Sequence, residues 1–353
     1  MEIVELESNI ISPEKMAPKG LVLAVYIFAF VTGLPSNLLA CYSFLRKVRQ
    51  NPVPIDILLL NLTISDLFIL FFLPFKMVEA ALDNTWPLPY FLCPLANFLF
   101  YSSIYLSTLF LMGVSVERYL CVAHPVKHKL NRRPTYAKVA SLFFWLLACS
   151  HCLSIVYVVE YYEGTDKKTD DNSTCYENFT AGQLRIVLPF RLELCIVLFL
   201  IPFIITLFCY ISVIRILTSM PNIKPQKKQR AVALALATVV NFSLAFAPYN
   251  ISHIVGFIQN KNPSWRVETF FLTSLNTTLD PVIFFFSSAT IRRAFTDFWL
   301  RICSTSASPC CLVCCRTPKT DAKEERAGQV SVSNMLAGSS TPTPFTRSGI
   351  SEN

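Results

Sequence analysis

The sequence predicts an all-α membrane protein in which seven transmembrane helices form one bundle. Of the 353 residues, 53% are hydrophobic and only 15% are charged, and the mean hydropathy is +0.47. Soluble domains carry about 25% charged residues, so this composition favours a membrane protein. An apolar run of roughly 20 residues can cross a bilayer as a helix. Seven such runs occur, at residues 21–45, 57–81, 90–122, 137–159, 184–217, 231–258 and 269–288.

Basic residues predict the orientation of these spans, because short cytoplasmic connections are enriched in Lys and Arg. The connections after spans one, three, five and seven are basic, whereas the opposite side is mainly acidic, which predicts an N-terminus outside the cell. The formal charge of +8 therefore reflects topology, and no nucleic-acid partner is needed to explain it. The basic residues are Arg46, Lys47, Arg49, Lys127, Lys129, Arg132, Arg133, Lys224, Lys227, Lys228, Arg230, Arg292 and Arg293.

The chain divides into four predicted parts. Residues 1–19 form an extracellular N-terminus, which is acidic and lacks the apolar core of a signal peptide, and residues 20–288 form the seven-span domain. Residues 289–301 alternate apolar and basic side chains, which predicts a short amphipathic helix on the inner membrane surface. Residues 302–353 are rich in Ser, Thr, Pro and Lys and predict a disordered cytoplasmic tail, either a phosphorylation substrate or a plain soluble extension.

Several side chains are candidates for covalent modification. Cys93 and Cys175 lie on the oxidising side and are predicted to form a disulfide, the alternative being two free thiols. Asn172 and Asn178 begin glycosylation sequons on that side. Four cysteines follow the last span, and palmitoylation suits them better than metal binding because no second ligand pair follows: Cys310, Cys311, Cys314 and Cys315.

Polar residues inside the apolar spans are candidate functional groups, because burying charge in a membrane is costly. Arg191 interrupts the apolar fifth run and predicts an anion-binding site. Four more polar residues lie in spans two, three and seven, where they favour a bound sodium ion, a shared proton, or interhelical hydrogen bonds without an ion: Asp66, Ser107, Asn276 and Asp280. The four histidines are scattered, and no catalytic group of nucleophile, base and acid is evident, so we expect neither a metal site nor an enzyme.

Landmark residues in all seven spans resemble the rhodopsin-like G-protein-coupled receptors. They are Asn37, Asp66, the Cys93 and Cys175 pair, the triplet Glu117-Arg118-Tyr119, Trp145, Pro202 with Tyr210, Pro248, and the run from Asp280 to Phe284. The resemblance implies that the triplet contacts a G protein. Three departures from the family pattern argue against the family's usual activation mechanism in this chain. Phe246 replaces a tryptophan, Phe284 replaces a tyrosine, and no acid near Lys228 can pair with Arg118.

The predicted outer third of the bundle carries cations. Arg191 lies about 16 Å outward of Pro202, and Arg266 about 22 Å outward of Pro281, at roughly 1.5 Å per residue. Two inward-facing guanidiniums, with His253 nearby, would repel one another unless an anion such as a carboxylate lay between them. The alternative is that the arginines extend to lipid headgroups or pair with loop acids such as Glu177.

Sequence around these cations resembles the free fatty acid receptors, most closely the short-chain types 2 and 3. The stretches are residues 187–195, 175–179, 248–253, 265–266 and 274–276. The resemblance implies that Arg191, Arg266 and His253 hold a carboxylate and that Tyr101, Tyr105 and Tyr249 line the pocket. It further implies a plasma-membrane receptor for acetate, propionate or butyrate, coupled to inhibitory and Gq-type G proteins and to arrestin.

Other functions remain as alternatives. A receptor for a hydroxycarboxylate or a longer fatty acid would also need paired cations. A carboxylate transporter could use intramembrane arginines too, but transporters usually show inverted repeats and Gly-interrupted helices, and this chain has an odd number of spans and only nine glycines.

Overall fold

The computed structural model describes residues 18–82, 85–130, 133–161, 175, 179–221, 225–263, 265–288 and 291–298. All regular elements among them are helical. The chain divides into two compact units, Met1–Phe295 and Thr296–Asn353, and the helices of the seven spans belong to the first.

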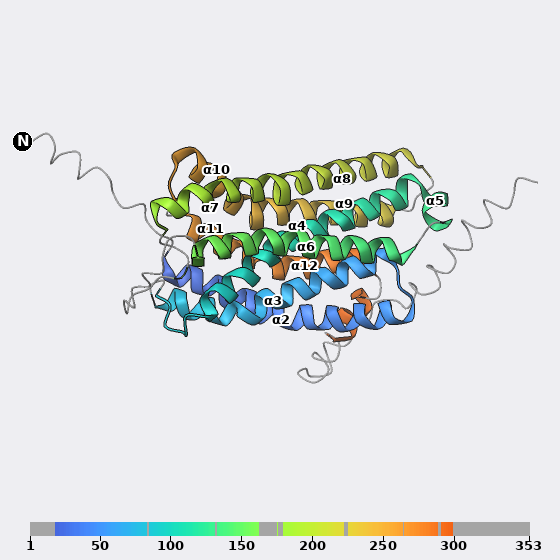
Figure 1. The fold of residues 1–353 in the computed structure, drawn as a ribbon. Helices are drawn as coiled ribbons and strands as arrows, with labels where there is room; N and C mark the ends of the chain where they lie inside the picture. The colour runs from blue at the N-terminus through green and yellow to red at the C-terminus, as the bar shows by residue number, and fades with distance from the viewer. Residues whose placement is uncertain are drawn as a thin grey trace, which may run out of the picture. The chain divides into compact units, whose positions relative to one another are not determined.

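The first four predicted spans are single long helices. They are α2 (Lys19–Gln50), α3 (Pro54–Ala81), α4 (Leu92–Ala123) and α6 (Pro134–Tyr161), and the short α5 (Pro125–Leu130) follows α4. Figure 1 shows α2 and α3 side by side, and α4 packs on α3, α6 and α8. The helices exceed the predicted runs at several ends, because polar residues such as Lys47 and Arg49 favour helix although they end the apolar segment.

The fifth and sixth spans each contain a π-helical segment that the apolar pattern did not predict. The fifth runs through α7 (Ala181–Leu194), η1 (Cys195–Leu200) and α8 (Ile201–Ser219). The sixth runs through α9 (Pro225–Asn241), η2 (Phe242–Phe246) and α10 (Ala247–Gln259). A proline follows each π segment, at Pro202 and Pro248. Because proline lacks an N–H and clashes with the carbonyl four residues earlier, the preceding hydrogen bonds shift to a wider spacing.

The seventh span is interrupted. It consists of α11 (Arg266–Ser274) and α12 (Asn276–Ser287), which are separated at Leu275. Six helical stretches among the described residues are long and apolar enough to cross a membrane, and the two short helices of the seventh span fall below that length individually.

Buried aromatic and aliphatic side chains fill the interior between the helices, with Phe44, Phe100, Phe110, Phe242 and Phe284 among the largest. The outside of α6 is apolar, and seven of its large side chains are more than half exposed: Tyr136, Val139, Leu142, Phe143, Leu146, Leu153 and Tyr157. A surface of this kind suits hydrocarbon rather than water.

The helices α2 and α12 approach each other closely at Gly33. A Cβ atom there would lie 2.9 Å from Thr277 Oγ1 and 3.1 Å from Leu70 Cδ2. One turn along α2, Asn37 donates from Nδ2 to the Thr277 carbonyl at 2.8 Å. The glycine permits this contact, which brings the polar face of α12 into the bundle.

Residues 291–298 are helical, and the other residues of the amphipathic helix predicted at 289–301 lie outside the described residues, so that helix stays a prediction. Its position on a membrane surface stays a prediction, as does the location of the N-terminus outside the cell.

Candidate functional site

Arg191 and Arg266 converge on one oxygen atom. Arg191 Nη1 donates to Asn262 Oδ1 at 2.9 Å, and Arg266 Nε donates to the same oxygen at 3.0 Å. Arg191 comes from α7 and Arg266 begins α11, and their exposed fractions are 4% and 3%. The two buried guanidiniums therefore point into a common space at the end of the bundle that holds the disulfide.

Aromatic rings surround this pair of cations. The Arg191 guanidinium lies 4.8 Å from the centre of the Phe179 ring, a distance typical of a cation–π contact. Arg266 lies beside the hydroxyls of Tyr101 and Tyr249. The rings of those two tyrosines stack at 6.3 Å, so α4 and α10 each contribute one wall.

His253 packs next to Tyr249 in the same cluster of aromatic residues. Its Nε2 atom is 3.2 Å from the hydroxyl oxygen of Tyr105, and its ring meets Tyr249 edge-on at 4.5 Å. The residue is 2% exposed, and its Nδ1 atom has no hydrogen-bond partner among the described residues. Because Tyr249 and His253 are four residues apart on α10, they occupy one face of that helix. The structure thus brings together six of the predicted ligand-binding residues.

Asn262 was not among the residues singled out from the sequence. It lies in the connection between α10 and α11, where a polar residue is unremarkable. No local signal distinguishes it, because its role depends on two arginines from different helices.

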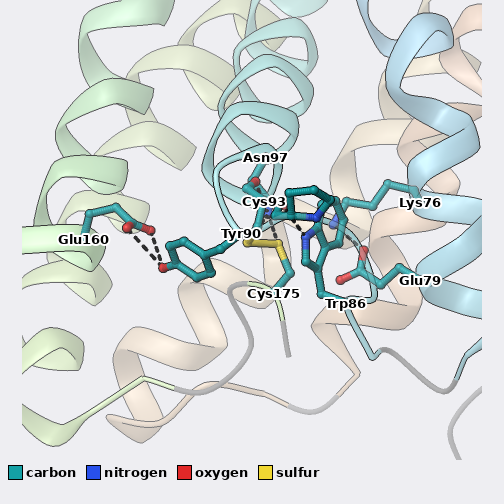
Figure 2. Close-up of a disulfide and its surroundings, with 9 residues drawn as sticks. Lys76, Glu79, Trp86, Tyr90, Cys93, Asn97, Glu160 and Cys175 are labelled. Atoms are coloured by element: carbon teal, nitrogen blue, oxygen red, sulfur yellow. Dashed lines mark hydrogen bonds and ion pairs between the residues drawn. A yellow bond between two sulfur atoms is a disulfide. The ribbon is translucent and has the colours of Figure 1, made fainter. Parts of the chain in front are cut away.

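The disulfide between Cys93 and Cys175 joins the start of α4 to the segment that precedes α7. Figure 2 shows Asn97, one turn further along α4, directed at the two sulfur atoms, and its Nδ2 donates to Cys175 Sγ at 2.8 Å. Tyr90 donates its hydroxyl hydrogen to Glu160 Oε1 at 2.9 Å, which ties the start of α4 to the end of α6.

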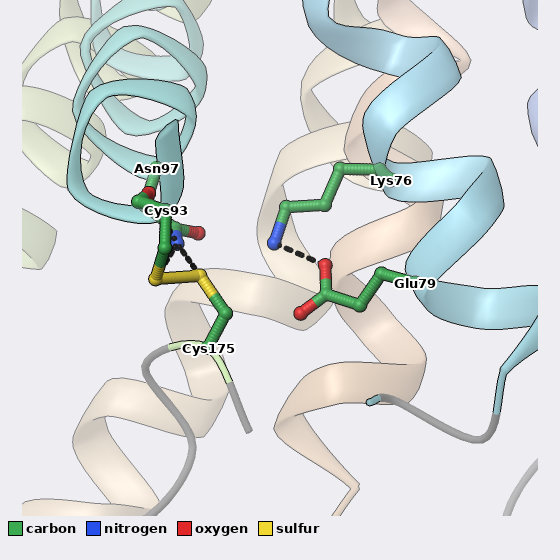
Figure 3. Close-up of polar contacts among 5 residues, drawn as sticks. All are labelled: Lys76, Glu79, Cys93, Asn97 and Cys175. Carbon is green, nitrogen blue, oxygen red and sulfur yellow. Dashed lines mark hydrogen bonds and ion pairs between the residues drawn. A yellow bond between two sulfur atoms is a disulfide. The ribbon is translucent and has the colours of Figure 1, made fainter. Parts of the chain in front are cut away.

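A third buried cation lies near this disulfide. Figure 3 shows Lys76 and Glu79 of α3 facing each other, with Nζ and Oε2 2.8 Å apart. The ammonium also lies 6.0 Å from the centre of the Trp86 ring. Sequence reasoning missed this pair, although a Lys and a Glu three residues apart in an apolar run are a recognisable signal.

The polar residues predicted inside the spans form one network. Asn276 donates from Nδ2 to Asp66 Oδ1 and to Ser107 Oγ, both at 3.1 Å. Asn241, which the sequence did not single out, donates to Asn276 Oδ1 at 2.7 Å and to Asp280 Oδ1 at 2.9 Å. The second carboxyl oxygens of Asp66 and Asp280 are buried without a hydrogen-bond partner among the described residues.

The opposite end of the bundle carries the triplet at the end of α4. Glu117 Oε1 lies 2.8 Å from His128 Nε2 of α5. Tyr119 packs against Phe208 of α8 with ring centres 5.9 Å apart. Arg118 lies close to Tyr210, whose hydroxyl is 3.2 Å from Thr238 Oγ1. Three helices thus meet around the triplet.

Some predicted site residues lie outside the described residues. They are Glu177, the sequon residues Asn172 and Asn178, and the cysteines Cys310, Cys311, Cys314 and Cys315. Their roles stay predictions.

Comparison with known proteins agrees with this architecture. The 7 transmembrane receptor (rhodopsin family) profile matches residues 36–284. Free fatty acid receptor 2 of Rattus norvegicus is 52% identical over 278 residues, which cover 78% of this chain and 84% of that protein. Free fatty acid receptor 3 of Homo sapiens is 46% identical over 283 residues, covering 80% and 81%. G-protein coupled receptor 42 of Homo sapiens is 47% identical with the same coverage.

These matches span nearly all of the helical bundle, and the relatives are receptors rather than enzymes. Apolar helices and the family match together make the chain a multi-pass membrane protein. The chain belongs to the rhodopsin family of seven-transmembrane receptors and, within it, to the free fatty acid receptors, with types 2 and 3 among its most similar relatives.

Proposed function

We propose that this chain is a plasma-membrane receptor, with its N-terminus outside, that is activated by short-chain carboxylates such as acetate, propionate and butyrate. The observation that carries the proposal is the convergence of Arg191 and Arg266 on a single oxygen. Arginine donors that meet at one acceptor are well placed to share a carboxylate, whose two oxygens accept several hydrogen bonds. The relatives named as free fatty acid receptors support the same ligand class.

The aromatic residues around the cations support a short ligand. Tyr105, Tyr249 and His253 are each at most 2% exposed and crowd the space below the guanidiniums. In this arrangement the carboxylate would bond the arginines, and the alkyl group would lie against the rings. His253 Nδ1, which has no hydrogen-bond partner among the described residues, would offer a further polar contact. A long acyl chain would have to displace these side chains.

The small size of such a ligand limits its affinity. Propionate has about five non-hydrogen atoms, and even the best small ligands gain no more than about 1.5 kcal/mol per atom. Part of that ceiling is lost in removing water from the carboxylate and the guanidiniums. We therefore expect sub-millimolar to millimolar potency.

Activation requires that the ligand bind one conformation of the bundle more tightly than another. A carboxylate that draws Arg191 of α7 towards Arg266 of α11 acts on the fifth and seventh spans together. The opposite end of the fifth span lies beside Arg118 through Tyr210. We propose that the receptor engages heterotrimeric G proteins of the inhibitory and Gq types through Arg118. Arrestin would bind the same end and a phosphorylated tail at residues 302–353.

The buried network around Asp66 and Asp280 is proposed to hold either a sodium ion or a shared proton. The two carboxyl groups lie close enough to repel each other, and each has one oxygen without a hydrogen-bond partner among the described residues. Oxygen ligands of this kind suit a hard cation. No other cofactor is proposed.

The remaining assignments follow from the proposed topology. Residues 1–19 would be extracellular, 20–288 would form the receptor domain, and 289–301 would lie on the inner leaflet. Asn172 and Asn178 would carry glycans, and the four tail cysteines would be palmitoylated.

A signalling experiment tests the arginine site. Cells expressing the full chain are given acetate through decanoate, and G-protein activation is measured for the wild type, Arg191→Ala and Arg266→Ala. Removing either guanidinium should lower potency at least 100-fold. Arg185→Ala is the matched control, because Arg185 lies on the same helix α7 but is exposed, and it should respond as the wild type does.

The alternatives predict different results. Retained propionate responses in both arginine variants, at equal surface expression, would exclude this carboxylate site. A stronger response to hydroxycarboxylates or to decanoate would assign a different carboxylate as ligand. Uptake of labelled propionate that scales with expression, without G-protein activation, would indicate a transporter.

A further inference from the structure

Asn262 occupies the position between Arg191 and Arg266 where the proposed ligand would bind. We infer that the Asn262 side chain is a built-in competitor of the carboxylate, and that a ligand must displace it to engage both arginines. This inference rests on the proposed function of the arginine pair, and it adds a residue that sets the concentration of carboxylate to which the receptor responds.

The backbone holds Asn262 in place. Helix α10 ends at Gln259, and the φ of 50° at the next residue, Asn260, turns the chain back. The Lys261 N–H then donates to the Gly256 carbonyl at 3.2 Å. At Gly256, a Cβ would lie 3.1 Å from both the Lys261 carbonyl oxygen and Pro263 Cδ. The absence of a side chain at Gly256 therefore lets the connection fold tightly against α10.

The other end of the connection is also fixed. The Arg266 N–H donates to the Pro263 carbonyl at 3.2 Å, which starts α11 directly after the turn. Asn262 thus stands between two backbone anchors, one on α10 and one on α11. These anchors position its side chain next to the two guanidiniums, so the contact forms without any external ligand.

The amide oxygen of Asn262 accepts hydrogen bonds from the arginines as one oxygen of a carboxylate would. One amide oxygen has two lone pairs and accepts one N–H from each arginine. The amide is neutral, so it does not offset the repulsion between the two cations. A carboxylate brings a negative charge and a second oxygen, and charge-assisted hydrogen bonds are roughly twice as strong as neutral ones. The ligand can therefore win the competition at sufficient concentration.

The competition has a measurable cost in apparent affinity. The N–H groups that bond Asn262 are not available to a ligand while the contact is closed. The apparent affinity equals the intrinsic affinity multiplied by the fraction of molecules in which the site is open, so it is lower when fewer sites are open. Removing the amide should raise the potency of every short carboxylate by a similar factor, because the amide competes for the group that all of them share.

Asn262→Ala and Asn262→Asp test the inference in opposite directions. Alanine removes the competing oxygen, so the half-effective concentration of propionate should fall by roughly threefold to tenfold. Aspartate places a tethered carboxylate between the same guanidiniums, so that concentration should rise at least tenfold. Lys261→Ala is the matched control, because this neighbouring side chain is exposed and should leave the response unchanged.

Propionate potency is measured by G-protein activation at matched surface expression, and binding by the rise in melting temperature of the purified receptor with increasing propionate. Asn262→Ser, whose shorter side chain cannot reach both arginines, serves if the alanine variant is not expressed, and its potency should also increase. Lower or unchanged potency in the alanine and serine variants would overturn the competitor role, as would wild-type potency in Asn262→Asp. If the Asn262 variants do not behave as expected while Arg191→Ala and Arg266→Ala abolish the response in the same assay, only the role of Asn262 is wrong. If the arginine variants do not abolish it, the arginine site itself is wrong.

Discussion

His128 and Glu117 are joined at the end of the bundle that carries the triplet, with Nε2 and Oε1 2.8 Å apart. An ionised carboxylate can only accept, so the histidine nitrogen donates the hydrogen. The bond connects α5 to the end of α4, next to Arg118. A histidine from the connecting helix α5 therefore binds the acidic member of the triplet.

We predict that His128→Phe lowers the maximal G-protein activation while changing the half-effective concentration of propionate less than threefold. The reason is that a largely buried carboxylate loses a hydrogen bond contributing about 1 kcal/mol or more, which loosens α5 where a G protein would dock. His128→Gln should restore activation, since its amide can donate from a similar position. Nucleotide exchange in membranes is the measurement, and the exposed Lys127→Ala is the control. Full activation by the phenylalanine variant would contradict the prediction.

A second prediction concerns the hydrogen bond between Tyr105 and His253. Tyr105→Phe removes the hydroxyl at 3.2 Å from His253 Nε2 and leaves both nitrogens of a buried imidazole unpaired. An unsatisfied buried polar group costs about 1–3 kcal/mol. We expect propionate potency to fall by roughly threefold to thirtyfold, corresponding to about 0.7–2 kcal/mol. Tyr42→Phe is the control, because Tyr42 is 65% exposed on α2. Equal potency of Tyr105→Phe and the wild type would show that the ring position does not depend on this bond.

The disulfide gives a third prediction. Replacing Cys93 and Cys175 by serine together should lower the melting temperature of the purified receptor and reduce its surface expression. The bridge restricts the unfolded chain over a sequence separation of 82 residues, and Asn97 loses its sulfur acceptor when the bridge is removed. Loss of a native disulfide commonly costs about 2–5 kcal/mol in small secreted domains. Cys121→Ser, at an exposed free cysteine, should melt as the wild type does. An unchanged melting temperature in the double variant would argue against a stabilising bridge.

The buried carboxyl pair gives a fourth prediction. If the network holds sodium, the wild-type receptor should melt at a higher temperature in sodium chloride than in choline chloride of equal ionic strength, because a ligand that binds only the folded state stabilises it. Asp66→Asn and Asp280→Asn should each abolish this difference, since each removes a charged oxygen ligand. No sodium dependence in the wild type would favour the shared proton instead.

Much of the bundle was predictable from local sequence. Apolar runs predicted the seven spans, and the match of residues 36–284 to the rhodopsin family confirms the receptor class. Hydropathy reports which residues tolerate lipid, and that property is local. It could not predict the π segments at Cys195–Leu200 and Phe242–Phe246, because a proline indicates a disturbed helix without indicating how the hydrogen bonds rearrange.

The polar network shows where local reasoning ends. Asp66, Ser107, Asn276 and Asp280 were recognisable because polar groups in apolar spans need partners. Asn241 was not singled out, since an amide near the middle of the sixth span could equally face another partner or a neighbouring backbone. Only the packing of α9 against α12 directs it to Asn276 and Asp280.

The sequence by itself determined the membrane class, the receptor family and the presence of cations in the predicted outer third of the bundle, where burying charge is energetically unfavourable. Hydropathy and side-chain charge are properties of single residues, so local sequence is enough to reveal them. The tertiary structure decided that Arg191 and Arg266 meet, that His253 bonds Tyr105, and that Asn262 lies between the arginines. These contacts join helices that are distant in the chain, and the direction of each side chain depends on helix rotation and crossing, which no local pattern encodes.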